Sequence, residues 1–162
     1  MKSGTSDRVE FRRCLTSEDF SLAVELTRAY LRQLDLDLAF QNIDRELADF
    51  PHMYGAPYGV FLLAFVDGEL AGGVGLRRLE SEVCEMKRLF VHDGFKGLGL
   101  GRRLCLRLIE EARSLGYAGM RLDTLERMTA ARTLYRSLGF RKIGPYCYNP
   151  DPTAEYLELV LA

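Results

Sequence analysis

The hydrophobic and polar positions of the chain divide it into short strand-like stretches and longer stretches with helical spacing. Strands are predicted at residues 9–15, 58–66, 69–77, 82–91 and 117–125, and two further strands near the C-terminus are joined through Asn149-Pro150-Asp151-Pro152. The Asp67-Gly68 pair supplies the positive φ angles of a tight hairpin turn. Residues 58–91 are therefore predicted to form a meander of three antiparallel strands.

Three longer stretches are predicted to be helices. The first follows Thr16 as N-cap, with Asp19 placed where a carboxylate suits the helix dipole, and the third covers residues 129–138 and is closed by Gly139. The second begins at Leu100, ends near Gly116 and has the apolar face Leu100, Leu104, Leu108, Ile109 and Ala112. A shorter helical piece lies around residues 43–50. The strand, helix and strand in the middle imply one parallel strand pair within a mixed α/β sheet.

Length and composition favour one globular domain over residues 1–162. The 162 residues are 48% hydrophobic and 28% charged, as in ordinary folded proteins. The apolar run at 60–66 is too short to cross a bilayer and the first residues lack an apolar signal region, so we expect no membrane partner and a cytoplasmic location. The four cysteines are scattered without a C-x-x-C pair, so we expect buried thiols, no metal site and no disulfide framework.

Positive charge gathers in the second half of the chain. The net charge is −1, but residues 85–144 hold 13 Lys and Arg against 6 Asp and Glu, a local charge of +7. Such a field favours a polyanionic ligand. Because no long basic stripe is present, we expect a phosphorylated small molecule and no nucleic acid.

The sequence Phe95-Lys96-Gly97-Leu98-Gly99-Leu100-Gly101-Arg102-Arg103 places three glycines immediately before the second long helix. Unpaired N–H groups at a helix N-terminus bind phosphate where side chains do not block the approach, and neighbouring cations add attraction. The spacing matches neither the P-loop nor the dinucleotide fingerprint. A pyrophosphate cradle and a merely flexible loop both fit this run.

Three ordered blocks resemble the GNAT superfamily of acetyl-CoA-dependent N-acetyltransferases. Residues 96–101 resemble its [Q/R]-x-x-G-x-[G/A] signature, with Lys96 in place of the usual Gln or Arg. The predicted strand 85–91 precedes this loop, as in the family, and residues 131–140 resemble its A-x-x-L-Y-x-x-x-G-F block. The family often has an Asn near the start of that last helix, where this chain has residues 126–129, and Thr129 is predicted to cap the helix instead.

The resemblance implies the fold and the cosubstrate site. It implies a mixed, mostly antiparallel sheet of about six to seven strands, helices on both faces and one splayed parallel pair. The pantetheine arm of acetyl-CoA would lie between the splayed strands and meet backbone groups of Leu89, Phe90 and Val91. The pyrophosphate would be held by Lys96, Gly97, Leu98, Gly99, Leu100, Gly101 and Arg102. A homodimer is also expected from the resemblance.

The same resemblance implies direct transfer of an acetyl group to a primary amine of a small molecule or peptide. Glu85 is the expected base, because several family members carry a catalytic glutamate there. Strand alternation predicts that Glu85 shares one face with Lys87, Leu89 and Val91. On the residues alone, an ordinary salt bridge of Glu85 to Lys87 or an arginine is an equal alternative.

Tyr135 is the expected acid for the departing thiolate, since a phenol donates a proton readily near its ordinary pKa of about 10. On the residues alone, its helical spacing with Ala131, Leu134 and Leu138 favours a core aromatic residue. The resemblance favours the catalytic role.

The acceptor side is less specific. Substrate contacts are predicted at Gln41, Tyr54, Arg78 and Tyr146, and a carboxylate-bearing amine follows if Arg78 faces the cleft. A free amino acid, a polyamine, an antibiotic and a protein N-terminus all stay open as acceptors. A larger donor such as succinyl-CoA and a non-catalytic acyl-CoA-binding sensor or interaction module are the alternative functions.

Overall fold

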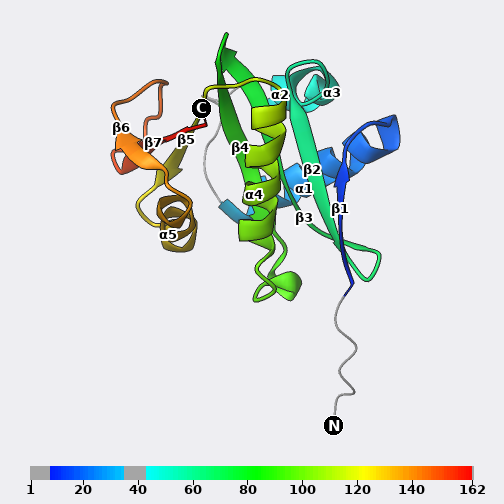
Figure 1. Ribbon diagram of the computed structural model, residues 1–162. Helices are drawn as coiled ribbons and strands as arrows, with labels where there is room; N and C mark the ends of the chain where they lie inside the picture. The colour runs from blue at the N-terminus through cyan, green and yellow to red at the C-terminus, as the bar shows by residue number, and fades with distance from the viewer. Residues whose placement is uncertain (1–7, 35–42, 162) are drawn as a thin grey trace.

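A computed structural model describes residues 8–34 and 43–161 and arranges its seven strands in one sheet of order β1-β2-β3-β4-β5-β7-β6 (Figure 1). The strands are β1 (Val9–Arg13), β2 (Val60–Val66), β3 (Glu69–Glu80), β4 (Val83–Val91), β5 (Gly119–Leu125), β6 (Arg141–Ile143) and β7 (Ala154–Val160). The helices are α1 (Ser17–Leu34), α2 (Ile43–Ala48), α3 (Phe50–Met53), α4 (Leu100–Ser114) and α5 (Thr129–Ser137). Of the described neighbours, only β4 and β5 are parallel, so the predicted mixed, mostly antiparallel sheet is confirmed.

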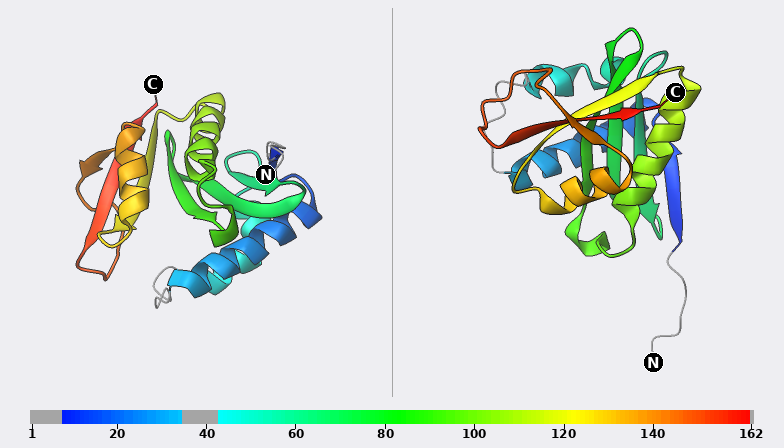
Figure 2. Two further views of the ribbon diagram at one scale, coloured as in Figure 1. Left: turned by 90° about the horizontal axis from the view of Figure 1, so that it is seen from below. Right: turned by 60° about the vertical axis from the view of Figure 1, so that its left-hand side comes forward.

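The middle of the sheet is covered on both faces. Every residue of β2 is buried, which explains its uninterrupted apolar sequence. One core contains α1, α3 and residues such as Leu26, Phe50 and Phe61, whereas the other contains the apolar faces of α4 and α5 with Leu104, Leu108 and others. Figure 2 shows α1 and α4 on opposite sides of the strands. The predicted helices on both faces are therefore confirmed.

Turns and caps agree with the sequence at most positions. Asp67 and Gly68 have φ angles of 49° and 82°, as a tight hairpin requires. The Asp19 N–H donates to Thr16 Oγ1 at 3.1 Å and the Thr16 N–H donates to Asp19 Oδ2 at 3.2 Å, which is a capping box at the start of α1. The prediction for Thr129 is wrong, because α5 begins at Thr129 and is preceded by a Met128 N-cap without a side-chain bond.

The strand β4 contains a bulge at Arg88 that changes the predicted faces. Arg88 has a φ of +63°, and residues 88 and 89 lie opposite the single residue Val74 of β3. Before the bulge, Cys84 and Met86 pack in the core that contains α4, whereas after it Leu89 and Val91 do so. The prediction that Glu85 and Lys87 share a face with Leu89 and Val91 is therefore wrong, since one extra residue inverts the alternation.

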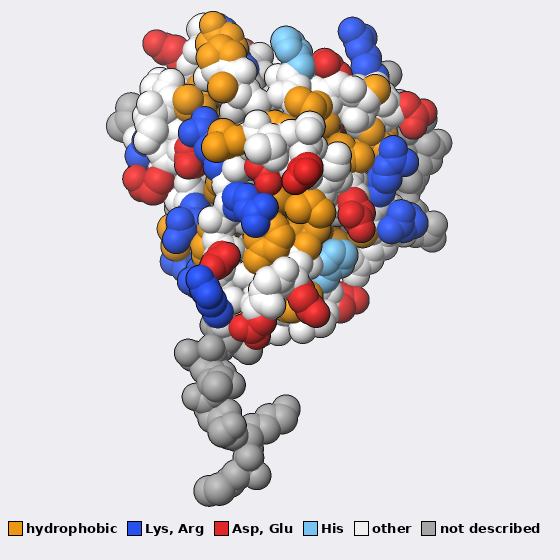
Figure 3. Space-filling view, turned by 90° about the vertical axis from the view of Figure 1, so that its right-hand side faces the viewer, with side chains coloured by type: hydrophobic (Ala, Val, Ile, Leu, Met, Phe, Trp, Pro, Cys, Tyr) orange, Lys and Arg blue, Asp and Glu red, His pale blue; other side chains and the backbone are white. Residues whose placement is uncertain are grey.

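The surface on the β1 side carries charges of both signs. Figure 3 shows hydrophobic side chains interspersed there with Lys, Arg, Asp, Glu and His. Two arginines of α4 cover the Phe11 ring of β1, with the Arg107 guanidinium 4.3 Å and the Arg103 guanidinium 5.1 Å from the ring centre. Among residues 8–34 and 43–161, no helix combines the length and the apolar character that crossing a membrane requires.

Candidate functional site

The two parallel strands separate soon after they meet. Pairing of β4 with β5 covers only Val83–Glu85 and Gly119–Arg121, and beyond these residues the strands diverge (Figure 2). We call residues 86–91 of β4 and 122–125 of β5 the splayed region. The expected splayed strand pair is confirmed, and it leaves one side of β4 without a strand neighbour over residues 86–91.

Backbone groups of two β4 residues point into the splayed region. The His92 N–H donates to Ala71 O of β3 at 2.8 Å. The Phe90 carbonyl oxygen also lies on the β3 side, since a Cβ atom added to Gly72 would be 2.5 Å from it. His92 and Phe90 therefore turn their backbone groups toward β3. Alternation then turns those of Leu89 and Val91 toward β5. Of the three residues predicted to offer backbone groups to a ligand, Leu89 and Val91 turn theirs into the splayed region, and Phe90 turns its own toward β3.

The glycine-rich loop presents a row of free amides. Within the described part of the chain, the backbone N–H groups of residues 97–102 donate to no other residue, and the first helical donor is Arg103, which bonds Gly99 O at 3.1 Å. Gly99 is the N-cap of α4 and lacks a side chain that could satisfy these groups. Six consecutive amides at the positive end of α4 are therefore without an acceptor among the described residues, as anion binding requires.

The three glycines of this loop have different reasons to be glycine. Gly97 and Gly99 have φ angles of +91° and +70°, which other residues rarely adopt, and open space lies where their Cβ atoms would be. Gly101 is helical and its Cβ would make an ordinary 3.6 Å contact with Leu134. Backbone conformation thus explains Gly97 and Gly99 but not Gly101.

The cations beside the loop are held in different directions. Lys96 pairs with Asp93 at 2.8 Å and is exposed, whereas Arg102 donates to Ser137 Oγ of α5 at 2.9 Å. Arg103 lies over Phe11 of β1 instead. Lys96 and Arg102 therefore stand at the two ends of the run of free amides, and their place in an anion site stays a prediction.

Glu85 is buried and surrounded by donors. Its Oε1 accepts Arg77 Nε at 2.8 Å and lies 3.8 Å from Lys87 Nζ, and its Oε2 accepts the Tyr146 hydroxyl at 2.7 Å. Burial, followed by the Glu85 charge, raises the pKa of Tyr146, so this hydroxyl stays a donor. The salt-bridge alternative for Glu85 is thus realised, and the carboxylate nevertheless stands at the beginning of the splayed region.

Tyr135 lies in the core that contains α4, with 8% of its surface exposed and its ring centre 5.8 Å from that of Phe140. Its carbonyl accepts the Phe140 N–H at 3.1 Å, and Gly139 between them has a φ of +100°, so this part of the sequence block also closes α5. Burial raises the pKa of Tyr135 well above the ordinary value. The Tyr135 hydroxyl donates to no other described residue. Every buried polar side-chain atom of the described residues has a hydrogen-bond partner, so this hydroxyl oxygen is not fully buried and reaches solvent.

The predicted acceptor residues are not brought together. Gln41 lies outside the described residues. Tyr54 is completely buried and donates to Glu46 Oε1 at 3.2 Å, so in this structure it is part of the core. Arg78 stacks its guanidinium 4.4 Å from the Tyr58 ring, on the side of β3 opposite Arg77 and Glu85. Tyr146 is the one of the four that the structure places beside Glu85.

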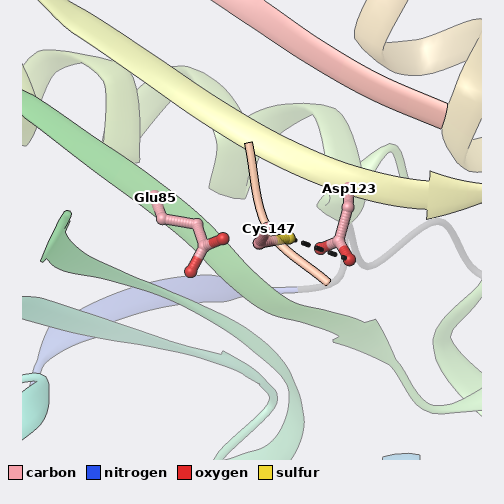
Figure 4. A group of neighbouring side chains, drawn as sticks. All are labelled: Glu85, Asp123 and Cys147. Carbon is pink, nitrogen blue, oxygen red and sulfur yellow. Dashed lines mark hydrogen bonds between the residues drawn. The ribbon is translucent and has the colours of Figure 1, made fainter. Parts of the chain in front are cut away.

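Several residues beside Glu85 were not singled out in the sequence. Arg77 is the β3 partner of Glu85 in the antiparallel register, and Asp123 follows its β5 partner Arg121 by two residues. Arg77 and Asp123 could have been found from the alternation of side chains along β3 and β5, but only with the register in which these strands pair with β4. A single sequence does not give that register. Figure 4 shows Asp123 and Cys147 on neighbouring segments beside Glu85.

The Glu85, Asp123 and Cys147 side chains could supply metal ligands, since one ligand atom of each lies within 4.8 Å of the others. Arg77 and Lys87 already pair with Glu85, however, and they repel a doubly charged metal ion about twice as strongly as a singly charged group. Cys147 is half-buried, unlike the other three cysteines, and burial followed by the Asp123 charge raises its pKa to about 11. Its thiol is therefore protonated at neutral pH, which does not favour metal binding.

Comparisons with known proteins agree with this geometry. The chain is 39% identical over 147 residues to an uncharacterized N-acetyltransferase of Schizosaccharomyces pombe, covering 90% of this chain and 88% of that protein. It is 32% identical over 117 residues to the N-acetylaspartate synthetase of Danio rerio, covering 71% of this chain and 42% of that protein. The PaiA N-acetyltransferase of Thermoplasma acidophilum, solved in complex with coenzyme A, matches the fold with a TM-score of 0.68 at 18% identity, over 94% of this chain and 99% of that one.

The sequence also matches the acetyltransferase (GNAT) family over residues 23–140. This range contains the splayed strands, the glycine-rich loop, Glu85 and Tyr135. The chain is a member of the GNAT family of acetyltransferases, and it is an acyltransferase enzyme.

Proposed function

We propose that the protein transfers the acetyl group of acetyl-CoA directly to a primary amine of a small molecule or peptide. The observation that carries this proposal is the row of free amides at residues 97–102, which lies at the end of a β4 strand with free backbone groups. Acetyl-CoA presents a pyrophosphate and an amide-rich arm that suit these two features. The coenzyme A bound to the PaiA enzyme, which has the same fold, supports the same cosubstrate here.

The backbone would position the thioester. Lys96, Arg102 and the amides of residues 97–102 would hold the pyrophosphate, and the backbone groups of Leu89 and Val91 would pair with the pantetheine arm. An amide fixed in a strand is a preorganised donor for the carbonyl oxygen that gains charge during attack. These residues therefore bind the donor and polarise it.

Glu85 and Tyr135 would move the protons. The amine nitrogen attacks the thioester carbon, the carbon–sulfur bond breaks, the ammonium proton passes to Glu85 through water, and the thiolate takes a proton from Tyr135. The raised pKa of Tyr135 keeps its hydroxyl protonated for this step. A covalent intermediate is not needed, and the raised pKa of Cys147 makes its thiol a weak nucleophile.

Two single-atom substitutions test these roles. Glu85→Gln and Tyr135→Phe should each lower kcat roughly 100-fold or more and change the acetyl-CoA Kd less than twofold. Calorimetry measures the affinity, and release of the coenzyme A thiol with a panel of amines measures turnover. Because the Tyr135 hydroxyl donates to no other described residue, Tyr135→Phe should leave the free energy of unfolding unchanged.

The outcomes separate the alternatives. Unchanged turnover in Tyr135→Phe would leave Tyr135 as a core aromatic residue, and unchanged turnover in Glu85→Gln at every pH would leave Glu85 as a salt-bridge residue. Binding of acetyl-CoA without turnover on any amine would favour the sensor. If a larger acyl-CoA were turned over faster than acetyl-CoA, that larger acyl-CoA would replace acetyl-CoA as the proposed donor.

Location and assembly are part of the proposal. The four cysteines are free thiols, and Cys14, Cys84 and Cys105 are buried, which suits the reducing cytoplasm. One domain over residues 1–162 is supported by the single sheet of the described residues. A homodimer stays a prediction that light scattering would test.

A further inference from the structure

Two charged atoms beside Glu85 lack a close partner. Within the described part of the chain, Lys87 Nζ forms one ion pair, with Glu85 at 3.8 Å, which is too long for a hydrogen bond. Asp123 Oδ2 accepts Asn149 Nδ2 at 3.1 Å and the Cys147 thiol at 3.9 Å (Figure 4), whereas Asp123 Oδ1 accepts no donor from those residues. Every buried polar side-chain atom of the described residues has a hydrogen-bond partner. Lys87 Nζ and Asp123 Oδ1 have none, so both atoms reach solvent, although the Lys87 side chain is only 13% exposed.

These two groups lie on one face of the sheet. Glu85 and Lys87 precede the bulge and share the face that carries α1, and Asp123 is two residues beyond Arg121, the parallel partner of Glu85. The charges of Asp123, Glu85, Lys87 and Arg77 all act on the Cys147 thiol. Lys87 Nζ and Asp123 Oδ1, each without a hydrogen-bond partner among the described residues, therefore lie on the same face as the proposed base and near Cys147.

The spacing of the two carboxylates fits one ammonium group. One oxygen of Glu85 and one of Asp123 lie within 4.8 Å of each other. A tetrahedral ammonium that donates to two oxygens at about 2.9 Å each holds them about 4.7 Å apart. An acceptor amine in its protonated form would thus bridge Asp123 and Glu85, and it would lose one proton to solvent before its nitrogen attacks the thioester.

We propose that the acceptor is a free amino acid, whose ammonium binds between Asp123 and Glu85 and whose carboxylate pairs with Lys87. The proposal rests on the proposed acetyl transfer and adds the class of acceptor to it. Lys87 would repel the second cation of a polyamine, and a peptide N-terminus has no carboxylate next to its amine. Arg77 is already held by Glu85, so Lys87 is the cation that decides between these acceptors.

The kinetic test compares the best amino acid substrate with its own amide. The twenty amino acids are screened with acetyl-CoA for thiol release, and kcat/KM is then measured for the best one and for its amide. Loss of the carboxylate charge should lower kcat/KM roughly 10- to 100-fold. Lys87→Met should remove this difference by lowering kcat/KM for the acid only, and Lys142→Met, at an exposed position of β6, is the matched control that should keep it.

A binding test avoids the chemical step. The same acid and amide are titrated into protein saturated with coenzyme A, which carries no acetyl group. Asp123→Asn should weaken both ligands, since both carry the ammonium, whereas Lys87→Met should weaken only the acid. Equal affinity for acid and amide, or equal losses in Lys87→Met, would overturn the proposal.

The test also separates this proposal from the proposed function. Acetylation of a polyamine or a peptide amine, with no amino acid accepted, would overturn the amino acid and leave acetyl transfer standing. Failure of acetyl-CoA itself to bind would overturn both.

Discussion

The Asp19 carboxylate lies in the first turn of α1, and the residue is buried, with 6% of its surface exposed. It accepts the Leu15 and Thr16 backbone N–H groups at 3.0 and 3.2 Å and the Arg12 guanidinium at 3.2 Å. The Leu15 bond makes the largest contribution to a pKa that is lowered to about 2. Because these donors bind the ionised form, α1 is fixed to β1 only while Asp19 is charged.

Acid should therefore weaken the fold through Asp19. Its pKa in the folded state is below the ordinary value, so its contribution is complete above about pH 4 and is lost as the pH falls toward 2. A shift of this size corresponds to about 2 kcal/mol. Urea unfolding of the wild type and of Asp19→Asn between pH 7 and pH 2.5 should show a stability difference that shrinks below pH 4. A difference that is constant over this range would contradict the assignment.

The loop before α4 joins two requirements in one element. Its positive φ angles at Gly97 and Gly99 aim the chain into the helix, and the amides that follow stay free. Gly101 already has a helical backbone, where alanine is more favourable than glycine by about 1 kcal/mol. The backbone therefore does not require glycine here, and we propose that the approach of the ligand does.

Gly101→Ala should separate these two requirements. The free energy of unfolding without ligand should stay equal or rise by up to about 1 kcal/mol, whereas the acetyl-CoA Kd should rise because the added methyl group lies in the first turn of α4, beside the amides proposed to bind the pyrophosphate. Gly99→Ala is the matched variant and should lower stability by about 1 kcal/mol through its left-handed backbone. Unfolding curves and calorimetry measure both effects. A Gly101→Ala protein with unchanged affinity would show that the amides are not the phosphate site.

Order and type of the elements were readable from the sequence, since turn residues such as Asp67-Gly68 and Gly139 act locally. The bulge at Arg88 was not, because its cause is tertiary: the Arg88 side chain turns toward Glu46 of α2. The same holds for Arg77 and Asp123, whose place beside Glu85 depends on the register of β3 and β5. The glycine-rich loop could thus be recognised from one contiguous segment, whereas the surroundings of Glu85 could not.

At the scale of the whole molecule, one buried ion pair ties the helical segment before β2 to the splayed strand. Arg88 donates to Glu46 through Nε at 2.8 Å and through Nη2 at 3.1 Å, and both side chains are at most 5% exposed. Tyr54 adds a bond to the same carboxylate at 3.2 Å. Burial alone would raise the pKa of Glu46, but the Arg88 bonds and charge lower it overall. The bulge that turns Leu89 and Val91 toward the proposed ligand therefore has its anchor in another part of the fold.

Breaking this pair should loosen both the fold and the site. Glu46→Gln leaves the Arg88 charge buried without its counter-charge, which costs about 3–5 kcal/mol. Glu110→Gln is the control, since it breaks an exposed pair with Arg113 and should cost less than about 1 kcal/mol. Denaturant unfolding measures both variants, and the acetyl-CoA affinity of folded Glu46→Gln protein should fall because the β4 bulge loses its anchor. If Glu46→Gln cost no more than Glu110→Gln, the bulge would be held by the sheet alone and the ion pair would have no part in shaping the site.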